Sequence, residues 1–293
     1  MASRAPIFRS YDQKALDAEY NNRAKVPDVE RYKDAQAKGA DEARRRFDCR
    51  LDVAYGPASA ERLDIYRPTG PGPYPIHVFI HGGYWRSNHK EESGYTALPF
   101  VPFGAIVAVV EYALIPTVDL AELIRQCRAA IAWLWHNARE FGGDPARITV
   151  SGHSAGGHLT AMMMATDWPA FASGLPPDLV KAGCGISGVY DLEPIRLSFH
   201  NGILHFTPEM VRRFSPVLLP PKSTGPLLLP VGGLEGYEFV RQSEDLAATW
   251  RAAGIDARAW VMPGHHHFST VNEYLKPESE LSRAVRTQMG LSR

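Results

Sequence analysis

Six short apolar runs, each bounded by Gly, Pro or Asn, place the strongest constraint on how this chain folds. The runs are 76–80, 105–112, 147–151, 182–187, 227–231 and 257–262. Runs of this length are typical of strands that are buried on both faces of a sheet. Helical patterns lie between them, the clearest at 119–141, where apolar residues recur at three- and four-residue steps. Strands that alternate with helices predict an α/β fold with a mostly parallel central sheet and helices on both faces.

Length and composition favour a single domain over residues 1–293. Hydrophobic residues make up 45% and charged residues 22%, which is typical of a globular domain with one large core. Residues 1–45 are charged and weakly periodic, and we expect an N-terminal arm laid over the body. The runs 46–56 and 61–68 predict a hairpin of early strands. The segment 188–226 lies between late strands and is a candidate lid or pocket insertion.

The charge balance and the cysteines exclude several classes of protein. The chain has 32 Lys+Arg against 32 Asp+Glu, so it lacks the basic footprint of a nucleic-acid binder. No stretch approaches the roughly 18 apolar residues of a membrane span, and the N-terminus lacks the apolar core of a signal peptide. We therefore expect a cytoplasmic protein with no membrane partner. Cys49, Cys127 and Cys184 are widely spaced, and we interpret them as buried thiols.

No cofactor or metal is expected. A phosphate loop is absent, and Gly-x-Gly-x-x-Gly does not follow the first strand. The successive His265, His266 and His267 invite a metal interpretation, but consecutive loop side chains diverge and no second motif completes a site. The expected partner is a small-molecule substrate. A homodimer is expected from base rates alone.

The most informative motif is Gly152-His153-Ser154-Ala155-Gly156, which directly follows the run 147–151 and directly precedes an apolar pattern at 159–165. A strand, a sharp turn and a helix form the context in which Gly-x-Ser-x-Gly presents a nucleophile. The glycines permit a turn that a Cβ atom would obstruct, and the helix dipole favours negative charge beside the hydroxyl. Ser154 is therefore the predicted nucleophile.

A second motif, His81-Gly82-Gly83-Tyr84-Trp85, follows the run 76–80. A strand end followed by two glycines lets backbone N–H groups turn inward. With the N–H after the nucleophile, such donors hold the oxyanion of a tetrahedral intermediate. We predict this role for Gly83, Tyr84 and Ala155. The sequence does not decide whether Trp85 packs in the core or forms part of a pocket wall. Tyr190 is a further candidate pocket residue.

A serine nucleophile needs a histidine base and an acid that orients it, with the acid earlier in the chain. Both residue types follow late strands, in the segments 232–239 and 264–268. Spacing alone does not choose among the three histidines. The competing acids are Glu238, Asp191 and Asp245; Asp245 falls in the helical pattern 239–254, typical of a solvated face, and Asp191 could instead cap a turn.

Several segments carry a resemblance to a known family. They are 81–85, 111–116, 141–145, 187–194, 238–243 and 267–268. The chain resembles the α/β-hydrolase superfamily and, within it, the kynurenine formamidase (arylformamidase) group. The resemblance implies Ser154 as nucleophile, His267 as base and Glu235 as acid. This group usually has Asp where the chain has Glu235, whose extra methylene reaches about 1.5 Å further.

The resemblance implies a serine hydrolase that cleaves a small acyl amide or ester through an acyl-enzyme, most closely an arylformamidase. The departure at Glu235 leaves a second reading open, a carboxylesterase of broad range on aryl or short-chain esters or carbamates. A third reading is a non-catalytic receptor with the same fold. Such receptors typically lack a member of the triad, whereas Ser154, Glu235 and His267 are all present here.

Overall fold

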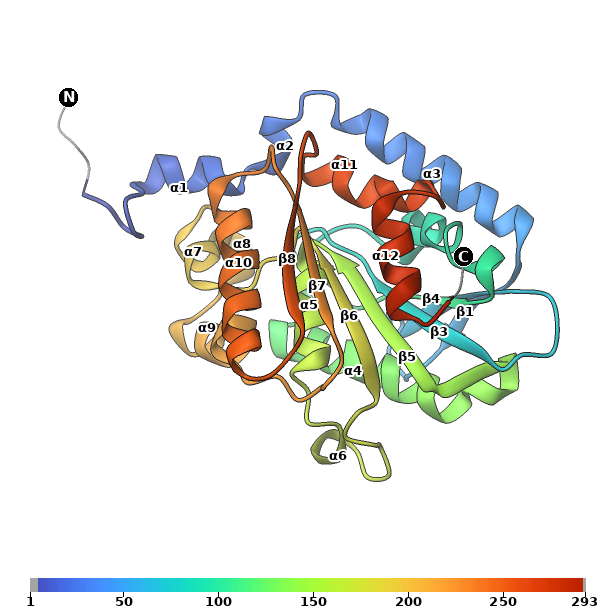
Figure 1. Cartoon of the computed structure of the whole chain (residues 1–293). Coiled ribbons are helices and arrows are strands. Elements are labelled where there is room, and N and C mark those ends of the chain that lie inside the picture. Colours follow the sequence, from blue (N-terminus) through green and yellow to red (C-terminus); the bar gives the residue numbers. More distant parts are fainter. Residues whose placement is uncertain (1–4, 292–293) are drawn as a thin grey trace.

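The computed structural model describes residues 5–291, so the first four residues of the predicted arm lie outside it. A central eight-stranded sheet has the order β1-β2-β4-β3-β5-β6-β7-β8 (Figure 1). The strands are β1 (Asp48–Ala54), β2 (Arg62–Arg67), β3 (Tyr74–Ile80), β4 (Ile106–Val110), β5 (Gly143–His153), β6 (Val180–Ile186), β7 (Leu227–Gly232) and β8 (Ala257–Met262). From β4 to β8 in this order all neighbours are parallel, and β1 and β2 pair antiparallel. The predicted mostly parallel sheet and the early hairpin are both confirmed.

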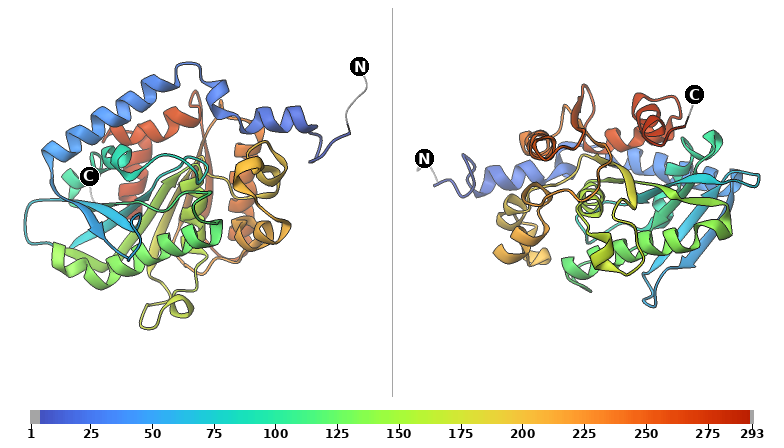
Figure 2. Two further views of the ribbon diagram at one scale, coloured as in Figure 1. Left: turned by 180° about the vertical axis from the view of Figure 1, so that it is seen from behind. Right: turned by 60° about the horizontal axis from the view of Figure 1, so that its bottom comes forward.

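Each central strand alternates between two hydrophobic cores, one on each face of the sheet. In β3, Ile76, Val78 and Ile80 enter one core, while Phe79 enters the other. The first core is covered by α4 (Leu120–Asn137), α5 (Ala155–Met164) and α10 (Tyr237–Ala252). The second is covered by η1 (Lys90–Ala97), η5 (Asn272–Leu275) and α12 (Glu280–Gln288). Helices on both faces explain why the strands are continuous apolar runs (Figure 2).

The helical segment formed by α4 and a following 3₁₀ turn begins and ends where the sequence signals predict. The Asp119 carboxylate accepts a hydrogen bond from the N–H of Glu122 and caps the first turn. After α4 the chain continues as the 3₁₀ helix η3 (Ala138–Phe141). This helical segment ends at Gly142, which has a φ of 79°. The remaining short helices outside the arm and the 188–226 segment are η2 (Val101–Phe103), α6 (Trp168–Phe171) and α11 (His267–Val271).

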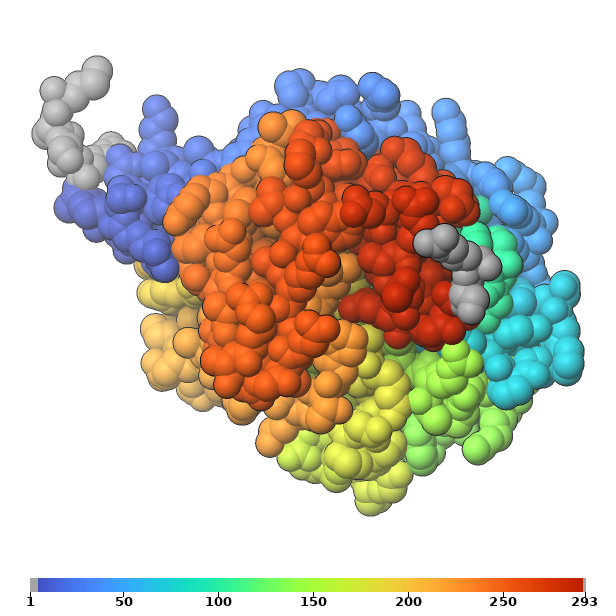
Figure 3. Space-filling model, viewed as in Figure 1, coloured from blue at the N-terminus to red at the C-terminus, as the bar shows by residue number. Residues whose placement is uncertain are grey.

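The predicted N-terminal arm is helical and lies along one edge of the sheet. It contains α1 (Gln13–Tyr20), α2 (Asn22–Lys25) and α3 (Val29–Arg46), drawn in blue in Figure 1. Asp12 caps α1, and Leu16 and Tyr20 are buried against the body. The space-filling view shows the arm lying against the orange and red C-terminal segments (Figure 3). The arm therefore packs against residues that are far from it in the sequence.

The segment 188–226 forms a cluster of short helices beside α10 (Figure 1). They are α7 (Glu193–Leu197), α8 (Asn201–Leu204), α9 (Pro208–Phe214) and η4 (Pro216–Leu218). Gln13 donates to the carbonyl of Leu197 at 2.9 Å, and Asp17 accepts from the N–H of Phe199 at 2.8 Å. The arm and this cluster thus meet. None of the helices in the described part of the chain is long and apolar enough to cross a membrane.

Candidate active site

Ser154 occupies a sharp turn between β5 and α5. Its backbone has a φ of 57° and a ψ of −118°, and its side chain makes no capping hydrogen bond. A non-glycine residue in this conformation is strained, and such strain concentrates at functional sites. The turn is tight because Gly156 crosses β3 closely; a Cβ atom on Gly156 would collide with the carbonyl oxygen of Ile80. The fold thus places the Ser154 hydroxyl at the N-terminal end of α5.

Glu235 and His267 come together from two different segments of the chain. Glu235 follows β7, His267 begins α11, and the Glu235 Oε2 atom lies 2.7 Å from His267 Nδ1. The other carboxylate oxygen of Glu235 accepts the N–H of Gly232 at 2.7 Å and the hydroxyl of Ser187 at 2.5 Å. The Glu235 side chain is fully buried. Because its second oxygen is held, the carboxylate has one fixed orientation toward the imidazole.

The loop after β3 approaches the Ser154 turn closely. Gly83 and Tyr84, in this loop, have φ values of 107° and 49°. A Cβ atom on Gly82 would lie 2.6 Å from the His153 carbonyl oxygen and 3.1 Å from Ser154 Cβ. Within residues 5–291, the N–H groups of Gly83, Tyr84 and Ala155 have no hydrogen-bond acceptor. They are therefore free to bind an oxyanion.

A cavity of about 310 Å³ opens onto these residues. Ser154, His267, Gly83 and Tyr84 all line it. The rest of its wall comes from the arm, the loop after β3, η1, the end of β5, the 188–226 segment and α11. These residues are Tyr20, Asn21, Asn22, Arg23, Lys33, Gln36, Arg86, Ser87, Asn88, Glu92, His153, Phe199, His200 and Phe268. The N-terminal arm thus closes one side of the cavity.

Comparisons with known proteins identify the family. The kynurenine formamidase of Danio rerio is 30% identical over 297 residues, which cover 97% of this chain and 99% of the relative. The kynurenine formamidase of Salmo salar is 30% identical and covers 94% of each chain. This chain belongs to the kynurenine formamidase family of α/β-hydrolases. A model of the family BD-FAE also matches residues 63–173.

Other relatives of this formamidase-family chain are esterases. Esterase LipC of Mycobacterium tuberculosis is 30% identical over 76% of this chain and 60% of its own length. A solved structure from Silicibacter, provisionally described as a thioesterase, has a TM-score of 0.81 at 28% identity and covers 92% of this chain and 97% of its own. The carboxylesterase EstE1 has a TM-score of 0.70 at 20% identity, over 92% of this chain and 98% of its own, and shows the shared fold.

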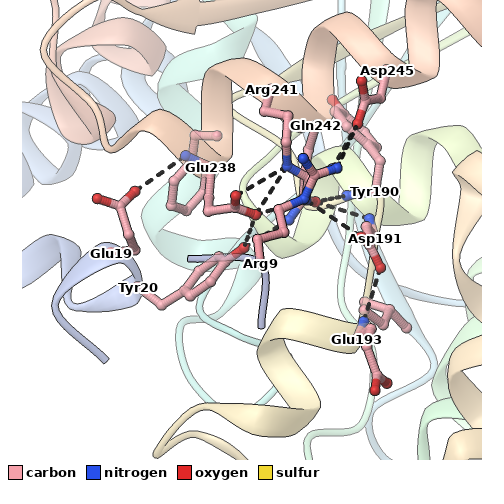
Figure 4. A network of polar contacts seen from close by, with 12 residues as sticks. Arg9, Glu19, Tyr20, Tyr190, Asp191, Glu193, Glu238, Arg241, Gln242 and Asp245 are labelled. Carbon is pink, nitrogen blue, oxygen red and sulfur yellow. Dashed lines mark hydrogen bonds and ion pairs between the residues drawn. The ribbon is translucent and has the colours of Figure 1, made fainter. Parts of the chain in front are cut away.

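The other candidate acids of this formamidase-family chain are bound to a different partner, Arg241. The guanidinium of Arg241 contacts Glu238 at 2.6 Å, Asp245 at 2.6 Å and Asp191 at 3.4 Å (Figure 4). Asp191 also accepts the N–H of Glu193 at 3.0 Å, which is the turn-capping role allowed by the sequence. Burial raises the pKa of Asp191. Of the acids considered from the sequence, only Glu235 is hydrogen-bonded to a histidine.

The three successive histidines have different surroundings. His267 is 5% exposed and lines the cavity. His266 caps α11, since its Nδ1 accepts the N–H groups of Phe268 and Ser269 at 3.3 and 3.2 Å. His266 and His267 thus have separate roles in the structure, one as a helix cap and one in the cavity wall. Among the described residues, no group of His, Cys, Asp or Glu has the arrangement of a metal site.

Trp85 and Tyr190, the two candidate pocket residues, lie in the core instead of the cavity wall. Both are 0% exposed. The Trp85 indole donates to His158 Nδ1 at 3.3 Å, and the Tyr190 hydroxyl donates to the carbonyl of Gly185 at 2.8 Å. Because both polar groups have internal partners, the rings can be buried completely. The aromatic rings in the cavity wall belong to other residues, among them Phe199 and Phe268.

His153 is a site residue that the sequence analysis did not single out. Its Nε2 donates to the main-chain carbonyl of His267 at 2.8 Å, and the two rings are 4.6 Å apart between centroids. Burial lowers the pKa of His153 well below its usual range, and the neighbouring His267 lowers it further. A neutral His153 is thus held as a donor that fixes the backbone of His267. The sequence did offer one indication of a role for His153, because this residue directly precedes Ser154 in the serine motif.

The cavity wall carries more positive than negative charge. Arg23, Lys33 and Arg86 line it, against one carboxylate, Glu92. Arg23 forms an ion pair with Glu30. Within the described part of the chain, Lys33 and Arg86 have no carboxylate partner within 4.0 Å. Unpaired cations in a concave site attract an anionic ligand.

Proposed function

We propose that this chain is a serine hydrolase that cleaves a small acyl amide through an acyl-enzyme on Ser154, acting as an arylformamidase. The observation that carries this proposal is the 2.7 Å contact between Glu235 and His267 at the edge of a cavity that Ser154 also lines. The near full-length similarity to relatives named kynurenine formamidase supports the choice of reaction. No cofactor is needed for this chemistry.

In the proposed reaction, Glu235 accepts the Nδ1–H of His267 and leaves Nε2 as the base. Nε2 takes the Ser154 proton while the serine oxygen attacks the carbonyl carbon. The oxyanion is bound by the N–H groups of Gly83, Tyr84 and Ala155. His267 then gives its proton to the leaving nitrogen, and the C–N bond breaks. Water repeats the cycle, releasing the acid and restoring the Ser154 hydroxyl.

The charge of the cavity supports a substrate that carries a carboxylate. Lys33 and Arg86 have no carboxylate partner among the described residues. A cation without such a partner favours the binding of an anionic ligand beside it. N-formylkynurenine has an aryl formamide and a carboxylate. We therefore propose an N-formylated aryl amine with a carboxylate as the substrate class.

A carboxylesterase of broad range is the second candidate. It is favoured by the similarity to Esterase LipC and by Glu235, which stands where the formamidase group usually has Asp. Both candidates use the same nucleophile and base. They differ in the leaving group, because an anilide must be protonated as it departs whereas a phenolate leaves with little help.

The test is kcat/KM of the purified protein on N-formylkynurenine and on p-nitrophenyl acetate. A strong preference for the formamide is expected; rapid ester cleavage with negligible formamide turnover would favour the carboxylesterase. Ser154→Ala is the control, and we expect it to abolish turnover of both substrates while leaving the circular-dichroism spectrum unchanged. Full activity in that variant would contradict a serine mechanism altogether.

A further inference from the structure

The loop after β3 contains two consecutive aromatic residues in the left-handed backbone region. Tyr84 has a φ of 49° and Trp85 a φ of 57°, directly after Gly83 at 107°. Residues with a Cβ atom avoid this region, and they remain in it only where their surroundings hold them. The N–H groups of Gly83 and Tyr84 owe their direction to this backbone. Whatever holds the two aromatic side chains therefore also holds the proposed oxyanion donors.

Trp85 is held by the core, because its indole N–H donates to His158 Nδ1 at 3.3 Å. Tyr84 is held by the N-terminal arm. The Tyr84 hydroxyl donates to the main-chain carbonyl of Tyr20 at 2.8 Å, and its ring stacks on His200 with centroids 3.8 Å apart. The same Tyr20 carbonyl accepts from His200 Nε2 at 3.2 Å. One carbonyl group of the arm thus fixes both the Tyr84 ring and the imidazole on which it lies.

Tyr20 is itself fixed to α10. Its hydroxyl donates to Glu238 Oε2 at 3.2 Å and accepts from Gln242 Nε2 at 2.8 Å (Figure 4). Its ring lies 5.7 Å from that of Phe239, and the residue is 1% exposed. Burial raises the pKa of Tyr20, and the Glu238 charge acts in the same direction. The phenol therefore stays protonated and able to donate.

The partners of the Tyr20 phenol are buried and are held by further hydrogen bonds. Glu238 is 0% exposed and bonded to Arg241, and its N–H donates to Glu19 of the arm at 3.1 Å. The side-chain amide oxygen of Gln242, Oε1, accepts the N–H groups of Tyr190 and Asp191 at 2.6 and 2.9 Å. The anchor therefore belongs to the core of the molecule, and α1 cannot shift without breaking several buried hydrogen bonds.

We propose that Tyr20 and Tyr84 are positioning residues of the oxyanion hole, the second through its hydroxyl. The Tyr20 phenol fixes the arm to α10, and the arm holds the Tyr84 side chain. The Tyr84 side chain in turn holds the strained backbone that presents the Gly83 and Tyr84 N–H groups to Ser154. This inference rests on the proposed serine-hydrolase function. The arm is then a working part of the site as well as a wall of the cavity.

Oxyanion donors act mainly on the transition state, so a loosened loop lowers kcat and leaves KM nearly unchanged. The variants are Tyr20→Phe, which removes the bonds to Glu238 and Gln242, and Tyr84→Phe, which removes the bond to the Tyr20 carbonyl. Each keeps its ring. With p-nitrophenyl acetate we expect kcat to fall about tenfold in each, less than the roughly hundredfold loss on removing a whole donor.

The double variant tests whether the two residues act through one link. We expect the kcat of the double variant to lie within about twofold of the kcat of the less active single variant, because both substitutions break the same connection. Phenylboronic acid, which forms a tetrahedral adduct with the serine oxygen, should bind each variant more weakly in proportion to the lost kcat. A purely structural role would lower the melting temperature without this proportional loss.

Tyr11→Phe is the matched control, since Tyr11 is a phenol of the same arm that does not line the cavity. We expect it to keep wild-type kcat and KM. Unchanged kcat in both test variants, or losses that multiply in the double variant, would overturn the positioning role. Failure of the proposed function gives a different result: the wild type would show no turnover and no boronic-acid binding, or Ser154→Ala would stay active.

Discussion

The Oε2 atom of Glu235 lies 2.7 Å from Nδ1 of His267, across 32 positions of the sequence. The contact depends on the length of the glutamate, because Oε1 is already held by the Ser187 hydroxyl and the Gly232 N–H. An aspartate is shorter by about 1.5 Å and could not span both sets of partners from the same backbone position. The loop after β7 is thus matched to a glutamate.

Replacing Glu235 tests the orientation of His267. We expect Glu235→Gln to lower kcat by a factor on the order of 10⁴, because an amide neither stabilises the imidazolium nor enforces the tautomer with Nδ1 protonated. Glu235→Asp keeps the charge but loses reach, and its kcat should lie between those of the wild type and the Gln variant. Steady-state kinetics on one substrate measure both. Equal activity of the wild type and the Gln variant would remove Glu235 from the mechanism.

Gly82 tests the close approach of the oxyanion loop to the serine turn. A Cβ atom there would lie 2.6 Å from the His153 carbonyl oxygen, so Gly82→Ala must push the two segments apart. We expect a loss of kcat of about a hundredfold or more. Gly202→Ala is the matched control, because a Cβ atom on Gly202 meets nothing within 4 Å. Normal activity of Gly82→Ala would show that the approach does not matter.

Arg86 tests the preference for an anionic substrate. The test substrates are 4-carboxyphenyl acetate and its carboxamide analogue 4-carbamoylphenyl acetate. For the wild type we expect the ratio of kcat/KM on the carboxylate to kcat/KM on the carboxamide to be greater than one. Arg86→Gln should reduce this ratio about tenfold, as expected for one charge-assisted contact. Arg23→Gln also changes the cavity wall, but Arg23 is paired with Glu30 and 63% exposed, so its ratio should stay unchanged. A ratio near one in the wild type would refute the anion preference.

Buried neutral histidines predict how stability depends on pH. Burial lowers the pKa of His158 to about 4 and that of His77 to about 3, below the usual value of about 6.5 in an unfolded chain. Between pH 6.5 and pH 4, each of these histidines is protonated in the unfolded state and neutral in the folded state. The free energy of unfolding therefore falls as the pH falls from about 6.5 to 4. Each such histidine contributes a slope of about 1.4 kcal/mol per pH unit.

Urea unfolding at several pH values between 7 and 4.5 measures this slope. His158→Gln offers one acceptor for the Trp85 indole and one donor for the Phe214 carbonyl, which are the two contacts that His158 makes. The variant should therefore fold and show a shallower slope by about one histidine. An identical slope in the variant and the wild type would contradict the buried neutral state of His158.

Much of the fold could be predicted because its signals are local. The six apolar runs correspond to β3 to β8, and the last of them matches β8 (Ala257–Met262) residue for residue. The serine motif could be placed because it combines, within a few residues, the end of a strand, two glycines and the first turn of a helix. This combination permits only one kind of turn. Parallel strands direct their carboxyl ends to one edge, which is why the segments after β7 and β8 lie at the same edge as Ser154.

The choice of partners was decided by tertiary structure. Glu235 and Glu238 are three residues apart, yet the first bonds to His267 and the second to Arg241. Which one faces the histidine depends on where the loop ends and α10 begins at Tyr237, and no local pattern specifies this. Trp85 lies in the core for a similar reason, because its indole partner, His158, is 73 positions away.

The sequence by itself determined the order of strands and helices, the strained serine turn and the edge of the sheet where the site lies, since these follow from periodicity and backbone sterics. Only the tertiary structure decided that the N-terminal arm closes the cavity. Tyr20 has no sequence signal, because its contacts with Tyr84 and Gln242 span 64 and 222 positions. Contacts of that range arise from packing of the whole chain, which local propensities do not encode.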